Sequence, residues 1–321
     1  MVSEGRRILI IRVVGAVAIT ASALLFFSFL APWLPPADSV GHFRQYLVLV
    51  LAILTVSQVM FGHRRAAAIS GVAALAGVFS MPQLFAPESS SADANFEVVQ
   101  ANLKFNNADV RGLESVVATA DAVALQEVSR YNDKTVSIIT AGFPSHQRCA
   151  MTDALDVMVL SRHTSSSGGC GEGLAWLRLT VESQPVTVVS VHLHWPWPFG
   201  QRDQLDKLRT TLSALPQPMI LAGDFNAAPW SAAVTDVARW SATHIMPGVR
   251  NTFTIELPIV GIGLDLPIDH ILLPKNFAMV SIDTSDPIGS DHLPLRARVS
   301  LPKRARITHY ARFSRKRTFD E

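Results

Sequence analysis

Six short, mostly apolar runs in the last two thirds of the chain end in, or contain, a polar side chain, and this pattern constrains the fold most strongly. The clearest run, Pro218 to Ala222, has the character of a buried strand; it stops at Gly223, and Asp224 and Asn226 follow. Side chains two positions apart on an extended segment point to the same face, so this carboxylate and this carboxamide can converge just past the strand end. Taken alone, the triplet is explained equally well by an Asx turn that closes a strand.

The five remaining runs place further polar groups at or near the ends of predicted strands. These groups are Asn102 after residues 96–101, Glu127 after 122–126, His192 within 186–193, Asp269 and His270 after 266–268, and Gly289 to His292 before a last short strand. Sheets that are covered by helices often carry their chemistry at strand ends. The six runs together predict one polar site that is assembled from distant parts of the chain.

Amphipathic helices are predicted between these strands, at about residues 108–120, 132–141, 201–214 and 231–240. In the third of them, Leu205, Leu208 and Leu212 recur at three-to-four spacing and form one apolar stripe. Strands that alternate with such helices indicate an α/β domain whose sheets are covered by helices.

The ordered set of motifs resembles that of the endonuclease/exonuclease/phosphatase superfamily, which has the DNase-I-like fold. The resemblance covers roughly residues 95–301 and rests on Gln100-Ala101-Asn102, Leu125-Gln126-Glu127-Val128, Val191-His192-Leu193, Gly223-Asp224-Phe225-Asn226, Ile268-Asp269-His270 and Gly289-Ser290-Asp291-His292. It implies an α/β fold of four layers, in which two packed β-sheets are flanked by helices. The periodicity of the sequence alone does not show two sheets.

The resemblance implies a hydrolase that breaks a phosphodiester or a phosphomonoester by metal-assisted attack of an activated water. The expected cofactor is Mg²⁺, with Mn²⁺ or Ca²⁺ as alternatives, because a hard divalent cation offsets the charge of the phosphate and of the leaving oxygen. Glu127 is expected to be the principal metal ligand and Asn102 to support it. Asp291 is expected at the metal or at a second metal position.

The same resemblance gives the catalytic residues. Asp224 is expected to orient and activate the water, and Asn226 to hold a non-bridging phosphate oxygen. His292 is expected to bind the phosphate or assist proton transfer, with Asp269 fixing its ring. His192 is expected to donate to the phosphate or to the leaving group. The identity of the general base stays open.

The first 86 residues are a predicted membrane region. The chain of 321 residues is 49% hydrophobic, and the excess lies at its front. Three apolar runs predict about three transmembrane helices, at residues 8–34, 45–62 and 66–86. A cleavable signal peptide is the alternative for the first run, and a buried helical hairpin for the other two. A linker is expected at 87–94, the catalytic domain at 95–301 and a basic tail at 302–321.

The positions of the basic residues predict the orientation in the membrane. Arg6, Arg7 and Arg12 precede the first run, and Arg64 and Arg65 stand between the second and the third. The positive-inside rule then puts the N-terminus in the cytoplasm and the catalytic domain outside it. In that compartment Cys149 and Cys170 either form a disulfide or remain two separate thiols.

The sequence restricts the substrate only partly. Residues 88–300 contain 15 Lys and Arg against 22 Asp and Glu, whereas proteins that bind nucleic acids usually show a basic face. The aromatic loop Trp195 to Phe199 suits base stacking, a lipid interface or simple packing. The basic tail is either solvated or bound to anionic lipid.

A lipid, a small molecule and a nucleic acid therefore all stay open as phosphoester substrates. The alternative functions are a nuclease for DNA or RNA that uses the same site, and a non-catalytic binding module tethered to the membrane. No specific protein partner is inferred. The number of metal ions, endo or exo action and the oligomeric state also stay open.

Overall fold

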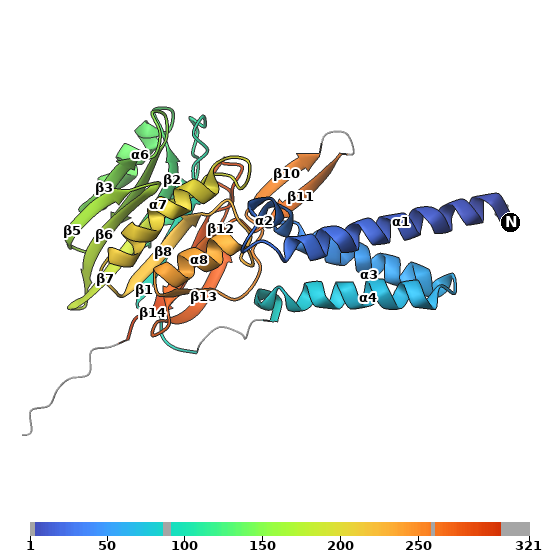
Figure 1. Ribbon diagram of the computed structural model, residues 1–321. Helices are drawn as coiled ribbons and strands as arrows, with labels where there is room; N and C mark the ends of the chain where they lie inside the picture. The colour runs from blue at the N-terminus through green and yellow to red at the C-terminus, as the bar shows by residue number, and fades with distance from the viewer. Residues whose placement is uncertain (1–3, 86–90, 258–260, 303–321) are drawn as a thin grey trace, which may run out of the picture.

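The computed structural model describes residues 4–85, 91–257 and 261–302 of the chain. A β-sandwich with helices forms one end of an elongated molecule, and a rod of helices forms the other (Figure 1). The predicted linker lies partly outside the described residues, and the predicted basic tail lies almost wholly outside them.

Two six-stranded mixed sheets build the sandwich. The strands of the first sheet, in the order of their neighbours, are β13 (Ala278–Thr284), β14 (Leu295–Ser300), β1 (Phe96–Asn102), β2 (Ala122–Val128), β4 (Asp156–Ser161) and β3 (Ser145–Ala150). The strands of the second sheet are β5 (Ser165–Gly171), β6 (Leu174–Val181), β7 (Gln184–His192), β8 (Met219–Asp224), β12 (Asp269–Pro274) and β9 (Thr243–Ile245). A separate hairpin pairs β10 (Phe253–Leu257) with β11 (Ile262–Leu266).

Parallel pairing occurs at the centre of each sheet, between β1 and β2 and between β7 and β8. The other paired strands are antiparallel. In a parallel pair both carboxyl ends lie at the same edge, so each sheet brings two strand ends together. The predicted polar groups follow these ends.

Four layers result, which confirms the predicted α/β sandwich. One apolar core lies between the sheets and includes Val98 and Val188 from opposite sheets. The first sheet is covered on its outer face by α5 (Leu113–Val117) and α6 (Asp133–Thr140), and the second by α7 (Gln201–Ala214) and α8 (Ala232–Trp240). Leu205, Leu208 and Leu212 of α7 are buried in the second outer core, as their spacing predicts.

Some elements differ from the sequence-based expectations. The helix expected at 108–120 is only the five-residue α5, which begins after Gly112 in the left-handed region at φ 82°. The strands β3, β5, β9, β10 and β11 were not expected. The glycine-rich residues 168–173 supply the end of β5 and the turn after it.

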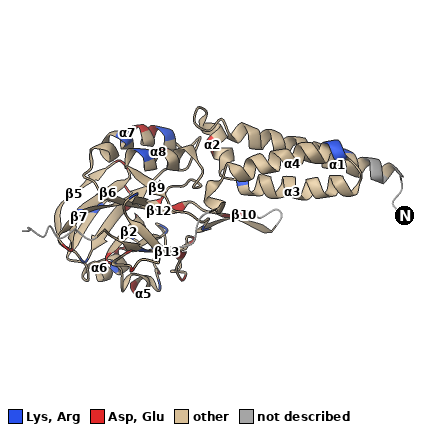
Figure 2. Ribbon diagram, turned by 90° about the horizontal axis from the view of Figure 1, so that it is seen from below, with Lys and Arg blue, Asp and Glu red and all other residues tan. Residues whose placement is uncertain are grey.

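The helical part consists of α1 (Glu4–Ser28), α2 (Pro35–Gly41), α3 (Arg44–Met60), α4 (Arg64–Phe79) and a short 3₁₀ helix, η1 (Pro82–Phe85). The helices α1, α3 and α4 run side by side in both views (Figures 1 and 2). The short α2 lies where these helices meet the sandwich.

The expectation of three membrane-spanning helices is corrected. Within the described residues, one helix is long and apolar enough to cross a membrane, Leu9–Ser28, or two if α2 and α3 form one bent span. The helices α3 and α4 have 17 and 16 residues. At 1.5 Å per residue each is roughly 25 Å long, which is shorter than a hydrocarbon core of about 30 Å.

The surface of the three-helix rod is apolar and its interior is partly polar. Large apolar side chains face outward along all three helices; Ile19 is 74% exposed, Met60 80% and Phe79 74%. Inside, the buried Arg44 donates from Nε to Ser28 Oγ at 2.8 Å. Charged residues are sparse along this rod and are frequent on the sandwich (Figure 2).

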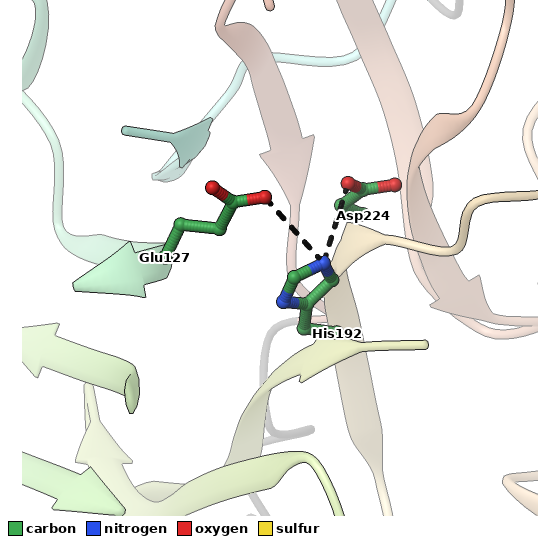
Figure 3. Close-up of side chains that lie close together, drawn as sticks. All are labelled: Glu127, His192 and Asp224. Atoms are coloured by element: carbon green, nitrogen blue, oxygen red, sulfur yellow. Dashed lines mark ion pairs between the residues drawn. The ribbon is translucent and has the colours of Figure 1, made fainter. Parts of the chain in front are cut away.

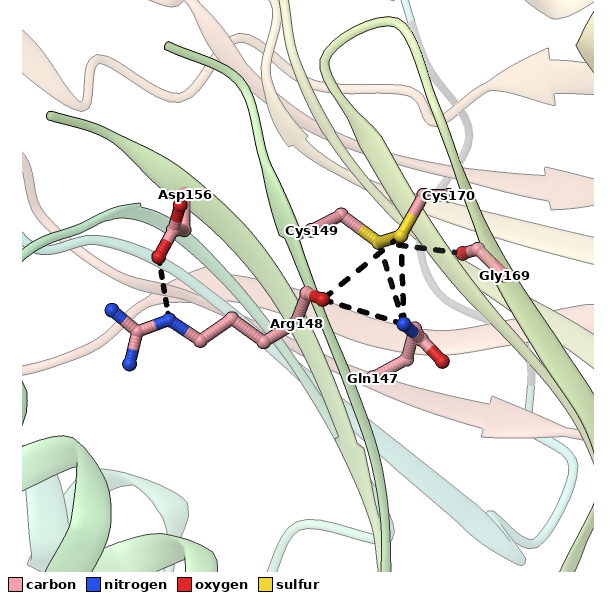
Figure 4. The surroundings of a disulfide bond; sticks show 6 residues. All are labelled: Gln147, Arg148, Cys149, Asp156, Gly169 and Cys170. Atoms are coloured by element: carbon pink, nitrogen blue, oxygen red, sulfur yellow. Dashed lines mark hydrogen bonds and ion pairs between the residues drawn. A yellow bond between two sulfur atoms is a disulfide. The ribbon is translucent and has the colours of Figure 1, made fainter. Parts of the chain in front are cut away.

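A disulfide joins the two sheets at one side of the sandwich (Figure 4). Cys149 lies on β3 and Cys170 on β5, and these strands are the outermost members of their sheets. The question that the sequence left open is thereby answered in favour of a bond. Cys149 is buried against Val157 and Ala175.

Candidate active site

Seven of the eight predicted site residues, all except Asp291, converge at one edge of the sandwich, where the strand ends meet. Asn102 ends β1 and Glu127 stands near the end of β2, the strand parallel to β1. His192 ends β7 and is in register with Asp224, which ends β8. Asp224 is in turn in register with Asp269 at the start of the antiparallel β12. Strand pairing therefore brings two functional groups together in the first sheet and three in the second, and the packing of the two sheets brings all five to one place.

Asn102 lies between two carboxylates, one from each sheet. Its Nδ2 is 3.1 Å from Glu127 Oε1 and 2.9 Å from Asp224 Oδ2 and donates to both. Its Oδ1 accepts from the backbone N–H of Lys104 at 2.9 Å. The backbone N–H of Phe105 donates to the other oxygen of Glu127 at 2.7 Å. The carboxylate of Glu127 is thus held from two sides.

His192 faces the same two carboxylates (Figure 3). Its Nε2 is 3.9 Å from Glu127 Oε1 and 3.6 Å from Asp224 Oδ2. Burial lowers the pKa of His192 to about 4, against the raising effect of Glu127. The ring is therefore neutral at physiological pH, and its buried Nδ1 has no hydrogen-bond partner among the residues that the structure describes.

Asp224 and Asn226 form a tight unit past the end of β8. The backbone N–H of Asn226 donates to Asp224 Oδ1 at 2.8 Å, and Asn226 Nδ2 donates to the carbonyl of Leu193 at 2.8 Å. This places Asn226 Nδ2 3.4 Å from His192 Nε2. The Asx turn considered from the sequence is therefore present, and it also orients the two side chains. Glu127 and Asn226 have φ of 55° and 47°, values that are uncommon outside glycine and are often found at functional sites.

Asp269 and His292 form a buried carboxylate–imidazole pair. His292 Nδ1 is 2.8 Å from Asp269 Oδ2, and His292 Nε2 is 3.9 Å from Asp224 Oδ2. Burial disfavours the charged ring, but the charges of Asp269 and Asp224 outweigh it and raise the pKa of His292 to about 10. His292 is therefore a cation at neutral pH.

The two aspartates at the centre of the site have pKa values shifted in opposite directions. Burial, reinforced by the charge of Asp269, raises the pKa of Asp224 to about 8. Burial also acts to raise the pKa of Asp269, but the charge of His292 and its hydrogen bond prevail and lower it. Asp224 is thus the carboxylate of this pair that takes up a proton more readily.

Asp291 and His270 lie apart from the converged groups. The carboxylate of Asp291 pairs with Lys104 Nζ at 3.3 Å, and both side chains are about two fifths exposed. His270 points away from the site, as its place next to Asp269 predicts; its Nε2 is 2.7 Å from the carbonyl of Ala227. Burial lowers the pKa of His270 to about 4.

A buried polar chain beneath the site has no counterpart in the predicted roles. Gln100 Nε2 donates to Asp269 Oδ1 at 2.6 Å and to Gln126 Oε1 at 2.8 Å. Gln126 Nε2 donates to Ser190 Oγ at 2.8 Å. The sequence holds one signal for Gln100: it stands two positions before Asn102 and so shares its face of the strand.

The arrangement fits a divalent cation. Glu127, His192 and Asp224 each offer a ligand atom, as do Asp224, Asp269 and His292, and within each group these atoms lie within 4.8 Å of one another. Carboxylate oxygens are the ligands that Mg²⁺ prefers. A cation beside Asp224 would also favour the ionised form of this buried carboxylate.

Comparison with known protein families gives one match. The sequence model for the Endonuclease/Exonuclease/phosphatase family matches residues 99–292. No curated protein sequence matches the chain.

Several solved structures share the fold at low sequence identity. TDP2 from D. rerio in complex with a single-strand DNA product has a TM-score of 0.53 at 16% identity, over 65% of this chain and 100% of that chain. The 3′ phosphatase NExo from Neisseria bound to a product DNA hairpin has a TM-score of 0.50 at 14% identity, over 64% and 100%. A variant of beta toxin from Staphylococcus aureus with bound magnesium ions has a TM-score of 0.50 at 15% identity, over 64% and 99%.

Proposed function

The chain belongs to the endonuclease/exonuclease/phosphatase family, and on this premise we propose that it is a membrane-anchored, divalent-metal-dependent phosphoesterase. The observation that carries the proposal is the convergence of three carboxylates, two imidazoles and two carboxamides from distant segments at one edge of the sandwich. Such a set can hold a cation, a phosphate and a water at once.

Glu127 would be the principal ligand of the cation, with Asn102 beside it and Asp224 within reach. Mg²⁺ is the favoured ion because it typically uses one or two carboxylates and keeps several waters. The magnesium ions in the beta toxin structure support this choice. When bound, the cation would offset the negative charge of the phosphate and of the departing oxygen.

Asp224 would orient the attacking water and accept its proton. The carboxylate is only 1% exposed and is fixed by Asn102 and Asn226, so its position is set before the substrate binds. Burial raises its pKa to about 8, so a cation bound beside it would be needed to keep the carboxylate ionised and able to accept a proton at neutral pH. Asn226 would donate to a non-bridging phosphate oxygen as charge grows there.

The two histidines would then have different roles. His292 carries a positive charge and would bind the phosphate, with Asp269 holding its ring through Nδ1. His192 is neutral and would donate a hydrogen bond to the phosphate or the leaving oxygen. The pKa of His192 is lowered and that of His292 is raised, and this difference assigns a different role to each imidazole.

Membrane anchoring through the N-terminal helices, with the sandwich outside the cytoplasm, completes the proposal. Support comes from the apolar surface of the three-helix rod, the arginines near the start of α1 and the disulfide, which is typical of an oxidising compartment. If α1 alone crosses and α3 with α4 returns to the same face, the sandwich still lies opposite the N-terminus.

The test is turnover of the full-length protein on bis-p-nitrophenyl phosphate and p-nitrophenyl phosphate, with Mg²⁺ or with EDTA. We expect hydrolysis that EDTA abolishes. The substitutions Glu127→Gln and His292→Asn should each lower turnover by about 100-fold or more, because each removes charge stabilisation from the reacting phosphate. Thermal unfolding of both variants should stay cooperative.

Matched controls are Glu114→Gln and His146→Asn, which change exposed residues on α5 and β3. Both control variants should hydrolyse the esters like the parent protein. Turnover that persists in Glu127→Gln and in His292→Asn would contradict the proposed mechanism, and EDTA-resistant turnover would contradict the metal dependence.

A further inference from the structure

The loops that carry the site are also the loops that hold the helices. Trp230, six residues after Asp224, donates from Nε1 to the carbonyl of Gly41 at 2.7 Å. The loop after His192 is held through Ser39 Oγ, which donates to the carbonyl of Trp197 at 3.0 Å. The active-site edge of the sandwich is therefore the edge that faces the helices.

A third contact joins the helices to the β10–β11 hairpin. Gln45 Nε2 and Tyr46 OH, at the start of α3, both donate to the carbonyl of Asp265 on β11, each at 2.8 Å. The hairpin projects from the sandwich toward the helices in both views (Figures 1 and 2). Near its described tip, Leu257 is 36% exposed and Ile262 54%.

The base of this hairpin forms one wall of the candidate site. The ring of Phe253, the first residue of β10, lies 4.8 Å from the ring of His292 and 5.7 Å from that of Trp195. Trp195, Trp197 and Phe199 continue this wall as an exposed aromatic rim, at 39%, 55% and 67% exposure. One apolar and aromatic surface thus runs from His292 along the described part of the hairpin to Leu257 and Ile262.

This surface lies at the level where the rod of helices meets the sandwich. The outside of the rod is apolar and part of its interior is polar, which suits a rod that is surrounded by a bilayer. If the bilayer surrounds the rod, the junction between the rod and the sandwich lies at the membrane surface. Tryptophan, which supplies two of the three rings of the rim, is enriched at that depth. A nucleic acid would instead need a basic surface, whereas residues 88–300 carry 22 acidic and 15 basic residues.

We propose that the substrate is the phosphoester headgroup of a lipid in the bilayer that holds the helices, and that the β10–β11 hairpin and the aromatic rim contact this bilayer beside the site. The proposal rests on the proposed phosphoesterase function and names its substrate class. In the reaction the oxygen of water bonds to phosphorus and the bond from phosphorus to the leaving oxygen breaks. One proton of the water goes to Asp224, which then releases it to solvent, and the leaving oxygen takes up one proton from solvent, so that one water is consumed in total.

The test compares a phosphate in a bilayer with the same chemistry in solution. The full-length protein is reconstituted into phosphatidylcholine vesicles that contain phosphatidylglycerol or phosphatidic acid. The soluble arms are glycerophosphoglycerol, glycerol 3-phosphate and a single-stranded oligonucleotide, all with Mg²⁺. We expect at least one vesicle lipid to be hydrolysed at least ten-fold faster than its soluble counterpart and than the oligonucleotide.

The double substitution Leu257→Asp and Ile262→Asp tests the hairpin. It should lower the ratio of lipid to soluble hydrolysis at least ten-fold, because two charges at the tip oppose contact with the bilayer. Ile138→Asp is the control, since Ile138 is 53% exposed and belongs to α6, a helix that lies far from α1, α3 and α4 in Figure 1. This control should keep the parent ratio.

The outcomes separate the two proposals. Hydrolysis of the soluble esters or of the oligonucleotide at a rate equal to or above that of every vesicle lipid would overturn the lipid inference and leave the phosphoesterase standing. An unchanged ratio in the hairpin variant would overturn the role of the hairpin. No hydrolysis in any arm, including the p-nitrophenyl esters, would overturn the phosphoesterase itself.

Discussion

At the scale of single residues, the site depends on side chains that fix other side chains. Asp269 holds His292, and Gln100 in turn holds the second oxygen of Asp269. Both Nε2 hydrogens of Gln100 are used, one for Asp269 and one for Gln126. Rotating this amide by half a turn would set its oxygen against a carboxylate, so the network defines one orientation only.

The substitution Gln100→Leu should therefore impair both turnover and stability. It leaves Asp269 Oδ1 buried without its donor, which should lower the free energy of unfolding by about 2 kcal/mol. Loss of a fixed Asp269 should lower kcat by about ten-fold with little change in KM. Steady-state kinetics and denaturant unfolding measure the two effects.

Gln126→Leu is the matched control, because it breaks the same chain one step further from Asp269. It should lower stability by a similar amount and leave kcat closer to that of the parent. If both variants lose turnover equally, Gln100 acts on stability alone and is not a positioning residue.

His270 makes the fold sensitive to acid. Its folded pKa of about 4 lies below the ordinary value of 6.5, so between these two pH values the unfolded chain binds a proton that the folded one does not. The stability that His270 contributes is complete above pH 6.5 and is lost as the pH falls toward 4, by up to about 3 kcal/mol. Denaturant unfolding between pH 7.5 and 4.5 measures this loss.

His270→Gln retains a donor for the carbonyl of Ala227 and removes the titration. Its stability should fall less steeply with pH than that of the parent, whereas His146→Gln, which alters an exposed ring, should follow the parent curve. Parallel curves for all three proteins would show that His270 does not cause the acid sensitivity.

At the scale of elements, the sequence predicts the central strands of both sheets and misses three of the four edge strands, β3, β5 and β9. The strands β1, β2, β7 and β8 are apolar runs because both of their faces are covered. In contrast β5, with the sequence Ser-Ser-Ser-Gly-Gly-Cys-Gly, has no such run. A Cβ on Gly169 would lie 3.0 Å from the ring of Trp176 on the neighbouring strand. Glycine is therefore present in β5 because the neighbouring strand packs closely against it, and a single sequence does not reveal this packing.

The same distinction holds for the site. The polar groups at strand ends converge because the sheets fix the register of the strands. Short sequence motifs at the strand ends were therefore sufficient to predict these groups. Asp291 stands next to His292 in the sequence, but its carboxylate turns outward to Lys104. Phe253 and the hairpin carry no motif, and their place beside His292 follows only from the three-dimensional fold.

The disulfide should stabilise the two edge strands that it joins. Cys149 and Cys170 are 21 positions apart, and closing a loop of that size contributes about 3 kcal/mol by restricting the unfolded chain. Reductant should therefore lower the midpoint of thermal unfolding. The double substitution Cys149→Ala and Cys170→Ala should lower it similarly and make it insensitive to reductant; a variant that unfolds like the oxidised parent would contradict this account.

At the scale of the whole molecule, the sandwich and the helices share a polar junction. The carboxylate of Asp38 on α2 accepts from the backbone N–H groups of Ala232 and Ala233 at 3.0 and 3.3 Å, at the start of α8. A negative charge at a helix N-terminus is favourable, and this one is buried. The junction therefore adds to the stability of α8 as well as to the attachment of the helices.

The substitution Asp38→Ala should lower the free energy of unfolding of the full-length protein in detergent by about 2 kcal/mol, because two buried N–H groups lose their acceptor. Asp206→Ala is the control, since Asp206 on α7 is 66% exposed and its pair with Arg202 contributes little. A shift for Asp38→Ala no larger than that of this control would show that the junction is not held by Asp38.

This junction also governs how the enzyme can be handled. Cutting the chain after η1 would remove Met81, whose side chain packs with Trp230, Ala228 and Val249. It would also remove Gly41, whose carbonyl accepts a hydrogen bond from the indole N–H of Trp230. The isolated sandwich would then expose the apolar side chains of this cluster to solvent close to the catalytic groups. Fragments that lack the N-terminal helices should therefore aggregate, and kinetic constants measured on them would belong to an altered active site.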